Sequence, residues 1–116
     1  MSSNALIDQF TYTFLNADTG IRLGIRTRSL ASPEFVQFRA FLKRNSSLRS
    51  GKNEMAPIFG SSFKSVQDQY SKVRSRVLKM DTNNPDEEEL KGLLVEVRKV
   101  TELLEGLSMV PERTRL

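Results

Sequence analysis

The sequence contains no cysteine, no histidine and no tryptophan. Without cysteine, a disulfide, a thiolate nucleophile or a zinc–thiolate site is impossible. The absence of cysteine also does not indicate whether the protein works in an oxidising or a reducing compartment. Without histidine, the commonest general base and the commonest metal ligand are missing as well. The glycines are scattered singly, so no glycine-rich loop can hold a phosphate, and no serine lies in a nucleophile motif. We therefore expect a protein that binds and assembles, not an enzyme, and we expect no cofactor.

Long apolar runs are also lacking. No stretch approaches the roughly 18 apolar residues of a membrane-spanning helix, and the start of the chain does not pass from a basic to an apolar segment. We expect neither a signal peptide nor a membrane span. A chain of 116 residues is close to the commonest size of one domain. The prediction is a single domain over residues 1–116, with a C-terminal tail at residues 109–116.

Charge is distributed unevenly along the chain. Residues 20–79 carry 13 Lys and Arg against 3 Asp and Glu, whereas residues 80–112 carry 3 against 9. A basic segment followed by an acidic one can bind a polyanion and also attract the acidic surface of a neighbouring copy. The alternative is that the two segments neutralise each other within one monomer.

The clearest local pattern lies near the C-terminus. Apolar residues at spacings of three and four predict an amphipathic helix over residues 85–107. Asn84 is expected to cap this helix, Pro85 to take its first position and the acidic run 86–89 its first turn, with an end near residues 106–108. The acidic run is also compatible with a metal site, although carboxylates at a helix N-terminus usually act as caps.

The same spacing predicts a helix over residues 62–80, with Ser61 or Ser62 as its cap. The loop 81–84 is short, so this helix and the next are expected to fold back on each other as an antiparallel hairpin.

The sequence Ser32-Pro33-Glu34 indicates the cap and first turn of a further helix. That helix should end in a polar loop over residues 45–52. We interpret residues 53–60 as a connection that is pinned by Ile58 and Phe59.

The first thirty residues are ambiguous. Apolar and polar residues alternate over residues 10–14 and again over residues 21–25, on either side of the turn-forming run 16–20, which is the pattern of a β-hairpin. A helix over residues 19–30 competes, although Gly24 counts against it. The pattern alone favours the hairpin.

Several short stretches resemble, in the same order, the coat proteins of rod-shaped plant RNA viruses of the tobacco mosaic virus and tobravirus type. These are Gln9-Phe10 with Ala17-Asp18, Ile21-x-Leu23, Leu30 and Phe35; Phe59-Gly60-Ser61-Ser62-Phe63-Lys64; Met80-Asp81-Thr82-Asn83; Val95-Glu96-Val97-Arg98; and Leu104-Glu105-Gly106-Leu107-Ser108 with Pro111 and Arg113. The resemblance implies a mainly α fold, an antiparallel four-helix bundle with short strands at one end. It also implies a helix over residues 19–30 in place of the hairpin.

The resemblance further implies a capsid protein that polymerises into a helical rod around single-stranded RNA, without reading its sequence. Its partners would be copies of itself and the RNA, with no membrane, and its location the virion and the host cytoplasm. Two other classes remain open: a small helical accessory subunit of a larger complex, and a monomeric nucleic-acid-binding regulator.

Individual residues also take roles from the resemblance. In the family, an aspartate that ends the third helix pairs with an arginine on the fourth, which here indicates Asp81 and Arg98. The segment whose arginines contact RNA in the family is shorter in this chain, and acidic residues replace the arginines that open the fourth helix, so the RNA contacts cannot be transferred as a set. The remaining RNA-binding candidates are Arg39, Arg44, Arg74, Arg76, Lys79, Asn83 and Lys91.

Four consecutive carboxylates are the last candidates. Asp86, Glu87, Glu88 and Glu89 are predicted to face like charge or phosphate across a subunit contact. Their repulsion would then promote disassembly as the pH rises or cations are diluted.

Overall fold

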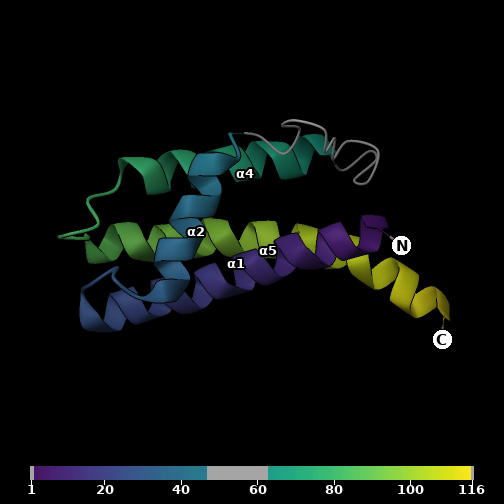
Figure 1. The fold of residues 1–116 in the computed structure, drawn as a ribbon, viewed down its shortest axis with the longest axis horizontal. Coiled ribbons are helices and arrows are strands. Elements are labelled where there is room, and N and C mark those ends of the chain that lie inside the picture. The colour runs from purple at the N-terminus through teal and green to yellow at the C-terminus, as the bar shows by residue number, and fades with distance from the viewer. Residues whose placement is uncertain (1, 47–62, 116) are drawn as a thin grey trace.

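A computed structural model describes the backbone of residues 2–46 and 63–115 and the side chains of residues 7–46 and 63–106. Over these ranges the chain forms four helices and no strand (Figure 1). The helices are α1 (Ser2–Thr27), α2 (Pro33–Arg44), α4 (Phe63–Lys79) and α5 (Glu87–Arg115). The prediction of a mainly α protein is confirmed, whereas the predicted short strands are not found in the described residues.

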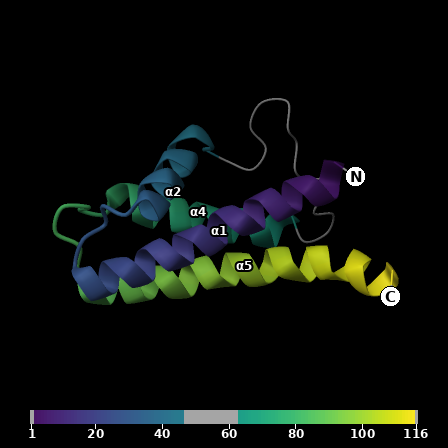
Figure 2. The same ribbon diagram turned by 60° about the horizontal axis from the view of Figure 1, so that its bottom comes forward.

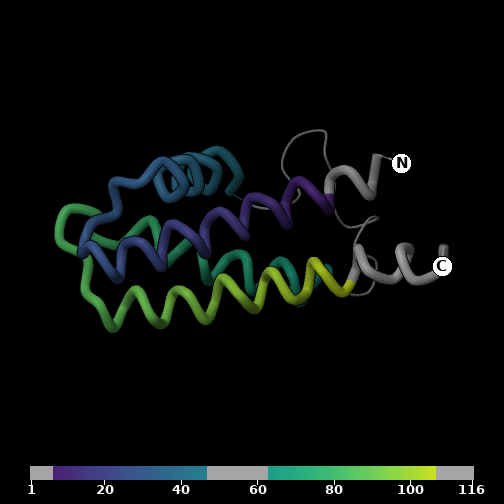
Figure 3. The backbone as a smooth tube through the Cα atoms, turned by 90° about the horizontal axis from the view of Figure 1, so that it is seen from below, coloured from purple at the N-terminus to yellow at the C-terminus, as the bar shows by residue number. Residues whose placement is uncertain are grey.

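Three long helices set the shape of the molecule, which measures 44 × 32 × 21 Å. α1, α4 and α5 extend along its long axis, with α5 antiparallel to both others, and α2 crosses them steeply (Figure 1). Figures 2 and 3 show α2 on the opposite side of α1 from α5. The predicted antiparallel hairpin of α4 and α5 is therefore confirmed, but α2 does not run antiparallel to its neighbours.

All four helices contribute to one hydrophobic core. The largest fully buried side chains include Phe14 and Ile21 of α1, Phe38 of α2, Tyr70 of α4 and Leu93 of α5. The Phe14 and Phe38 rings meet edge to face, with their centroids 5.2 Å apart. Each large apolar side chain buried in this way contributes about 1.5–3 kcal/mol, so the core holds the crossing helix α2 against α1 and α4.

The hairpin predicted for residues 10–25 is wrong, because these residues lie inside α1. A Cβ atom added to Gly20 would stand 2.9 Å from the backbone nitrogen of Phe35, and one added to Gly24 would stand 2.6 Å from Cδ2 of Leu30. The two glycines therefore permit close approach of α1 to the segment that begins α2, and they do not form a turn. The helix that the resemblance implies at residues 19–30 is present only to Thr27, and Arg28 ends it with a left-handed φ of 59°.

The predicted caps have mixed outcomes. Ser32 caps α2 as expected, since its Oγ accepts a hydrogen bond from the N–H of Phe35 at 3.3 Å. The cap predicted for the last helix is wrong: α5 begins at Glu87, and Oδ2 of Asp86 accepts the hydrogen bond from the N–H of Glu89 at 3.0 Å. The residues before it stay in the loop because the Asp81 carboxylate accepts hydrogen bonds from the N–H groups of both Asn83 and Asn84.

The end predicted for this helix at residues 106–108 is also wrong. α5 continues to Arg115, so the predicted tail at residues 109–116 begins inside it. Gly106 is helical and has open space around it, so it does not act as a C-terminal cap. Two further predictions fall outside the described residues: the helix cap at Ser61 or Ser62, and the apolar contact of Ile58 and Phe59. None of the described helices is both long and apolar enough to cross a membrane.

Candidate nucleic-acid interface

Two hydrogen bonds from α4 hold the C-terminal end of α2. Nε of Arg74 donates to the carbonyl oxygen of Leu42 at 2.8 Å, and the hydroxyl of buried Tyr70 donates to the carbonyl oxygen of Asn45 at 2.5 Å. The last carbonyl groups of a helix have no partner within the helix, so α4 satisfies two groups at the end of α2. Burial raises the pKa of Tyr70, which keeps its hydroxyl protonated and able to donate.

A polar hollow opens beside this contact. It is lined by Ser46, Ser71, Arg74, Ser75, Leu78 and Lys79. Residues 71, 75 and 78 share one face of α4, because residues three and four apart lie next to each other on a helix. Among the described residues the lining offers three hydroxyls and two cations but no carboxylate, which is a composition that suits an anion.

A second hollow lies between α2 and the loop that follows α4. It is lined by Leu30, Phe35, Val36, Arg39, Ala40, Lys43 and Thr82. Nε of Arg39 is buried and has no hydrogen-bond partner among the described residues. A buried donor without a partner costs about 1–3 kcal/mol, and more when it is charged, so Arg39 carries an unsatisfied buried nitrogen beside the hollow that it lines.

Both hollows lie beside α2: Arg39 and Lys43 stand one turn apart on this helix and line the second hollow, and Ser46, two residues beyond the end of the helix, lines the first. We call the polar residues of the two hollows the α2/α4 seam. It consists of Arg39, Lys43, Ser46, Ser71, Arg74, Ser75, Lys79 and Thr82.

The cations of the seam have no carboxylate partners in the described part of the chain. The ion pairs found there involve other basic residues, namely Arg22, Arg28, Lys64, Lys91 and Arg98. Exposed cations that are not neutralised locally are the groups that attract phosphate.

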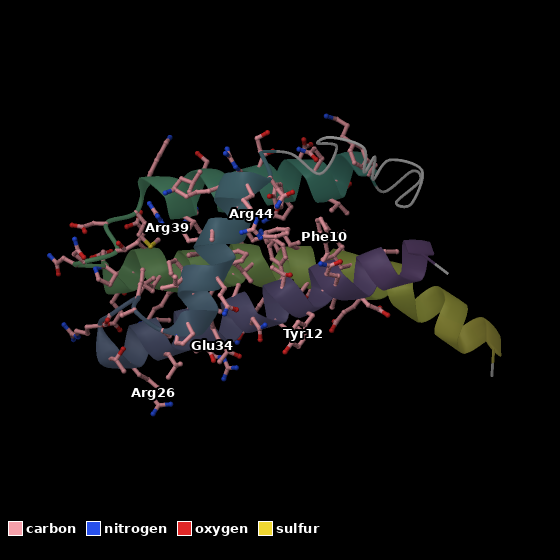
Figure 4. All side chains as sticks on the ribbon, in the orientation of Figure 1. Phe10, Tyr12, Arg26, Glu34, Arg39 and Arg44 are labelled. Carbon is pink, nitrogen blue, oxygen red and sulfur yellow. The ribbon has the colours of Figure 1, made fainter. Side chains whose placement is uncertain are left out.

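Arg44 lies apart from the seam, because it and Arg39 are on opposite sides of α2 (Figure 4). It lines a groove between α1 and α2 that also contains Tyr12, Phe41, Glu34 and the side-chain amide of Gln37. Tyr12 is 67% exposed there. The Glu34 carboxylate gives this groove mixed charge, unlike the seam.

The other predicted RNA-binding residues do not join the seam either. A guanidinium nitrogen of Arg76 lies 2.9 Å from the position that a Cβ on Gly92 would occupy, so this side chain covers α5. Lys91 pairs with Glu87 at 3.2 Å, a contact that raises the pKa of Lys91. Asn83 is exposed in the loop between α4 and α5. Of the seven candidates, Arg74 and Lys79 line the first hollow and Arg39 lines the second.

The predicted pair of Asp81 and Arg98 does not form within the chain. Nε of Arg98 donates to Oδ2 of Asp18 at 2.7 Å, while Oδ1 of Asp18 accepts from Nε of Arg22 at 2.7 Å. Partial burial raises the pKa of Asp18, but the hydrogen bonds and charges of Arg98 and Arg22 outweigh it and leave that pKa below its ordinary value. Asp81 instead caps the loop through backbone N–H groups.

The four predicted inter-subunit carboxylates occupy the start of α5. Asp86 caps the helix, and Glu87 pairs with Lys91 and, at 3.8 Å, with Arg28. Glu88 and Glu89 project from the first turn and are exposed. The described residues contain no group of three or more acidic side chains arranged to hold a metal ion.

Sequence reasoning missed several functional candidates. Lys43, Ser46, Ser71, Ser75 and Thr82 complete the seam, and Asp18 takes the role assigned to Asp81. The helical spacing on each side of the seam is visible in the sequence. What the sequence does not show is that α2 crosses α4, and this crossing brings the two faces together.

Comparison of the chain with protein-family models, with curated proteins and with solved structures finds no match in any of the three.

Proposed function

We propose that this protein is a structural capsid subunit that polymerises into a helical rod and encloses single-stranded RNA without reading its sequence. The observation that carries the proposal is the α2/α4 seam, where four cations and four hydroxyls face solvent-accessible hollows with no carboxylate among the described lining residues. Cations that neutralise phosphates supply affinity that is independent of sequence.

Binding by a single chain should be weak, which is why polymerisation belongs to the proposal. Each phosphate that a cation neutralises on a single strand contributes only about 0.7 to the slope of log affinity against log salt. Neighbouring copies on one strand would raise the effective concentration of every further contact. The acidic start of α5 and the basic seam lie on different elements, and two copies that meet through unlike patches form open filaments when the rotation does not close.

Electron microscopy in negative stain tests the proposal. We expect the purified protein, examined from pH 5 to 8 with and without RNA, to form rods whose 260/280 nm absorbance ratio is that of a nucleoprotein. A monodisperse monomer with the ratio of a protein would contradict the proposal and favour an accessory subunit of a larger complex. A monomer that binds RNA or duplex DNA at moderate salt without forming polymers would instead favour a regulator.

The acidic residues predict how rods should respond to pH. Glu88 and Glu89 are exposed and are not the cap, so replacing both with glutamine should leave the fold intact. If they face like charge in the rod, the rods of the double variant should persist to a higher pH than those of the wild type. An unchanged pH limit in a turbidity titration would show that these carboxylates do not drive disassembly. Asp8→Asn with Glu102→Gln, two exposed residues away from the start of α5, is the control for the same change in net charge.

A further inference from the structure

We propose that the α2/α4 seam binds two successive phosphate groups of one RNA strand, one in each hollow. This inference rests on the proposed function, because it assigns the RNA backbone to a defined site. It leaves Arg44, Arg76 and Lys91 outside that site.

The first phosphate position is the hollow beside the end of α2. Nε of Arg74 is engaged by the Leu42 carbonyl at 2.8 Å, which fixes the guanidinium plane while its terminal nitrogens remain to donate. Lys79 supplies a second charge on the same hollow, and Ser71 and Ser75 add hydroxyls that rotate to suit an acceptor. A guanidinium held in place loses less conformational freedom when it binds, so this is the better organised of the two positions.

The second phosphate position is the hollow beside the loop after α4. Arg39 and Lys43 stand one turn apart on α2 and both line it, with the hydroxyl of Thr82 opposite. Nε of Arg39 is buried without a partner among the described residues. Arg39 lines the hollow, and its guanidinium would give a phosphate charge-assisted hydrogen bonds, which are stronger than those between neutral groups.

The ligand is an extended chain of phosphates and not a single ion. Arg39 lines one hollow, whereas Ser46, two residues beyond the end of α2, lines the other, and no described lining residue is shared by the two. Two separate basic hollows suit two phosphate groups of one strand better than a single ion. The polar groups of the seam are cations and hydroxyls, which are groups that contact the phosphates carried by every nucleotide, so we expect binding that does not depend on sequence.

The first test compares two double variants of equal charge. Lys43→Gln with Lys79→Gln removes one cation from each hollow, whereas Lys72→Gln with Lys99→Gln removes two exposed lysines between α4 and α5. The binding of fluorescein-labelled octauridylate and octaadenylate is followed by anisotropy over a salt series, with protein too dilute to assemble. The seam variant should lower the salt slope by about 1.4 for both oligonucleotides, and the control should leave it nearly unchanged. Equal effects of the two variants, or no effect of either, would overturn the assignment.

A second test removes no cation and so does not depend on the first. Ser75→Asp places a carboxylate in the first hollow, whereas Ser65→Asp places one at an exposed site of the same helix facing α5. Because like charges close together repel strongly, Ser75→Asp should weaken octauridylate binding by on the order of tenfold relative to Ser65→Asp. Equal binding by the two variants would contradict a phosphate in that hollow. A doubly phosphorylated peptide that displaces octauridylate at equal concentration would overturn the choice of RNA as the ligand.

Electron microscopy of the same proteins separates this inference from the proposed function. If the wild type forms RNA-containing rods but the seam variants bind octauridylate normally, the site assignment is wrong and the capsid proposal stands. If the seam variants lose octauridylate binding while the wild type never forms rods, the seam stands and the capsid proposal is wrong.

Discussion

A single methyl group at Gly20 should destabilise the protein, because α1 lies against the backbone at the start of α2 there. A Cβ at this position would stand 2.9 Å from the backbone nitrogen of Phe35, 3.1 Å from its Cβ and 3.2 Å from its Cα. None of these atoms is the end of a flexible side chain, so a rotamer change cannot relieve the clash. The first turn of α2 would have to move away from α1.

The expected magnitude follows from two opposing effects. Alanine is favoured over glycine in a helix by about 1 kcal/mol. Extra volume in a well-packed interior costs about 1–3 kcal/mol, and contact with backbone belongs at the upper end of that range. We therefore expect Gly20→Ala to lower the free energy of unfolding by about 1–2 kcal/mol. For a domain of this size, that corresponds to a fall in melting temperature of roughly 5–10 °C.

Gly106→Ala is the matched control, since Gly106 is also helical and has nothing within 4 Å of an added Cβ. Without a clash, this substitution should raise the free energy of unfolding by about 0.5–1 kcal/mol. Urea unfolding followed by far-UV circular dichroism measures both variants. If Gly20→Ala is as stable as the wild type, the close contact of α1 with Phe35 is wrong. A stabilised Gly20→Ala would also remove the physical reason for a glycine at this position.

Three further substitutions test individual contacts by urea unfolding. At pH 7, Asp18→Asn should lower the free energy of unfolding by about 1 kcal/mol, since it removes the ion pairs with Arg22 and Arg98. Because the pKa of Asp18 is lowered on folding, this contribution is present above the ordinary value of 3.8 and is lost as the pH falls through the lower folded value. A difference from wild type that does not shrink as the pH falls below 3.8 would contradict the ion pairs. Tyr70→Phe should lower the free energy of unfolding by about 1–2 kcal/mol, because it leaves the Asn45 carbonyl without its donor. An unchanged free energy of unfolding would mean that water replaces the hydroxyl. Asp86→Ala removes a helix cap and should lower the free energy of unfolding by about 1 kcal/mol, whereas Asn84→Ala should change it by less than about 0.5 kcal/mol. A larger loss for Asn84→Ala than for Asp86→Ala would show that Asn84 is the cap.

The bounds of α2 and α4 could be predicted from the sequence nearly to the residue, because the pattern that marks each helix is local. In α4, the residues that carry the spacing, Val66, Tyr70, Val73 and Val77, are all buried, and the helix ends within one residue of the prediction on each side. Such a pattern needs no knowledge of partners, since any partner would bury the same stripe.

α1 was not predicted from its pattern because its informative residues act through tertiary contacts. Gly20 and Gly24 have low helix propensity, and with the polar residues around them they have the composition of a turn. The structure shows why glycine stands at these positions: a side chain there would collide with Phe35 and Leu30, which lie against α1. Tertiary packing thus outweighs a propensity penalty of about 1 kcal/mol per glycine.

The candidate site could be predicted only in part, for a related reason. The sequence shows which residues are cationic but not which of them are neutralised. Lys91 could have been set aside, because Glu87 lies four residues before it in an expected helix. The positions of Arg74 and Arg76, two residues apart on the same helix, could not be told apart: one reaches α2 and the other covers α5.

The position of α2 links the packing of the core to the proposed binding site. Gly20 fixes the start of this helix through its contact with Phe35, and Arg74 and Tyr70 fix its end, so the seam has its shape only while both ends are held. Gly20→Ala should therefore weaken octauridylate binding under conditions where the variant is still folded, although it removes no charge. Gly106→Ala should bind as the wild type does. If Gly20→Ala binds normally despite its loss of stability, cationic charge alone, and not the placement of α2, accounts for RNA affinity.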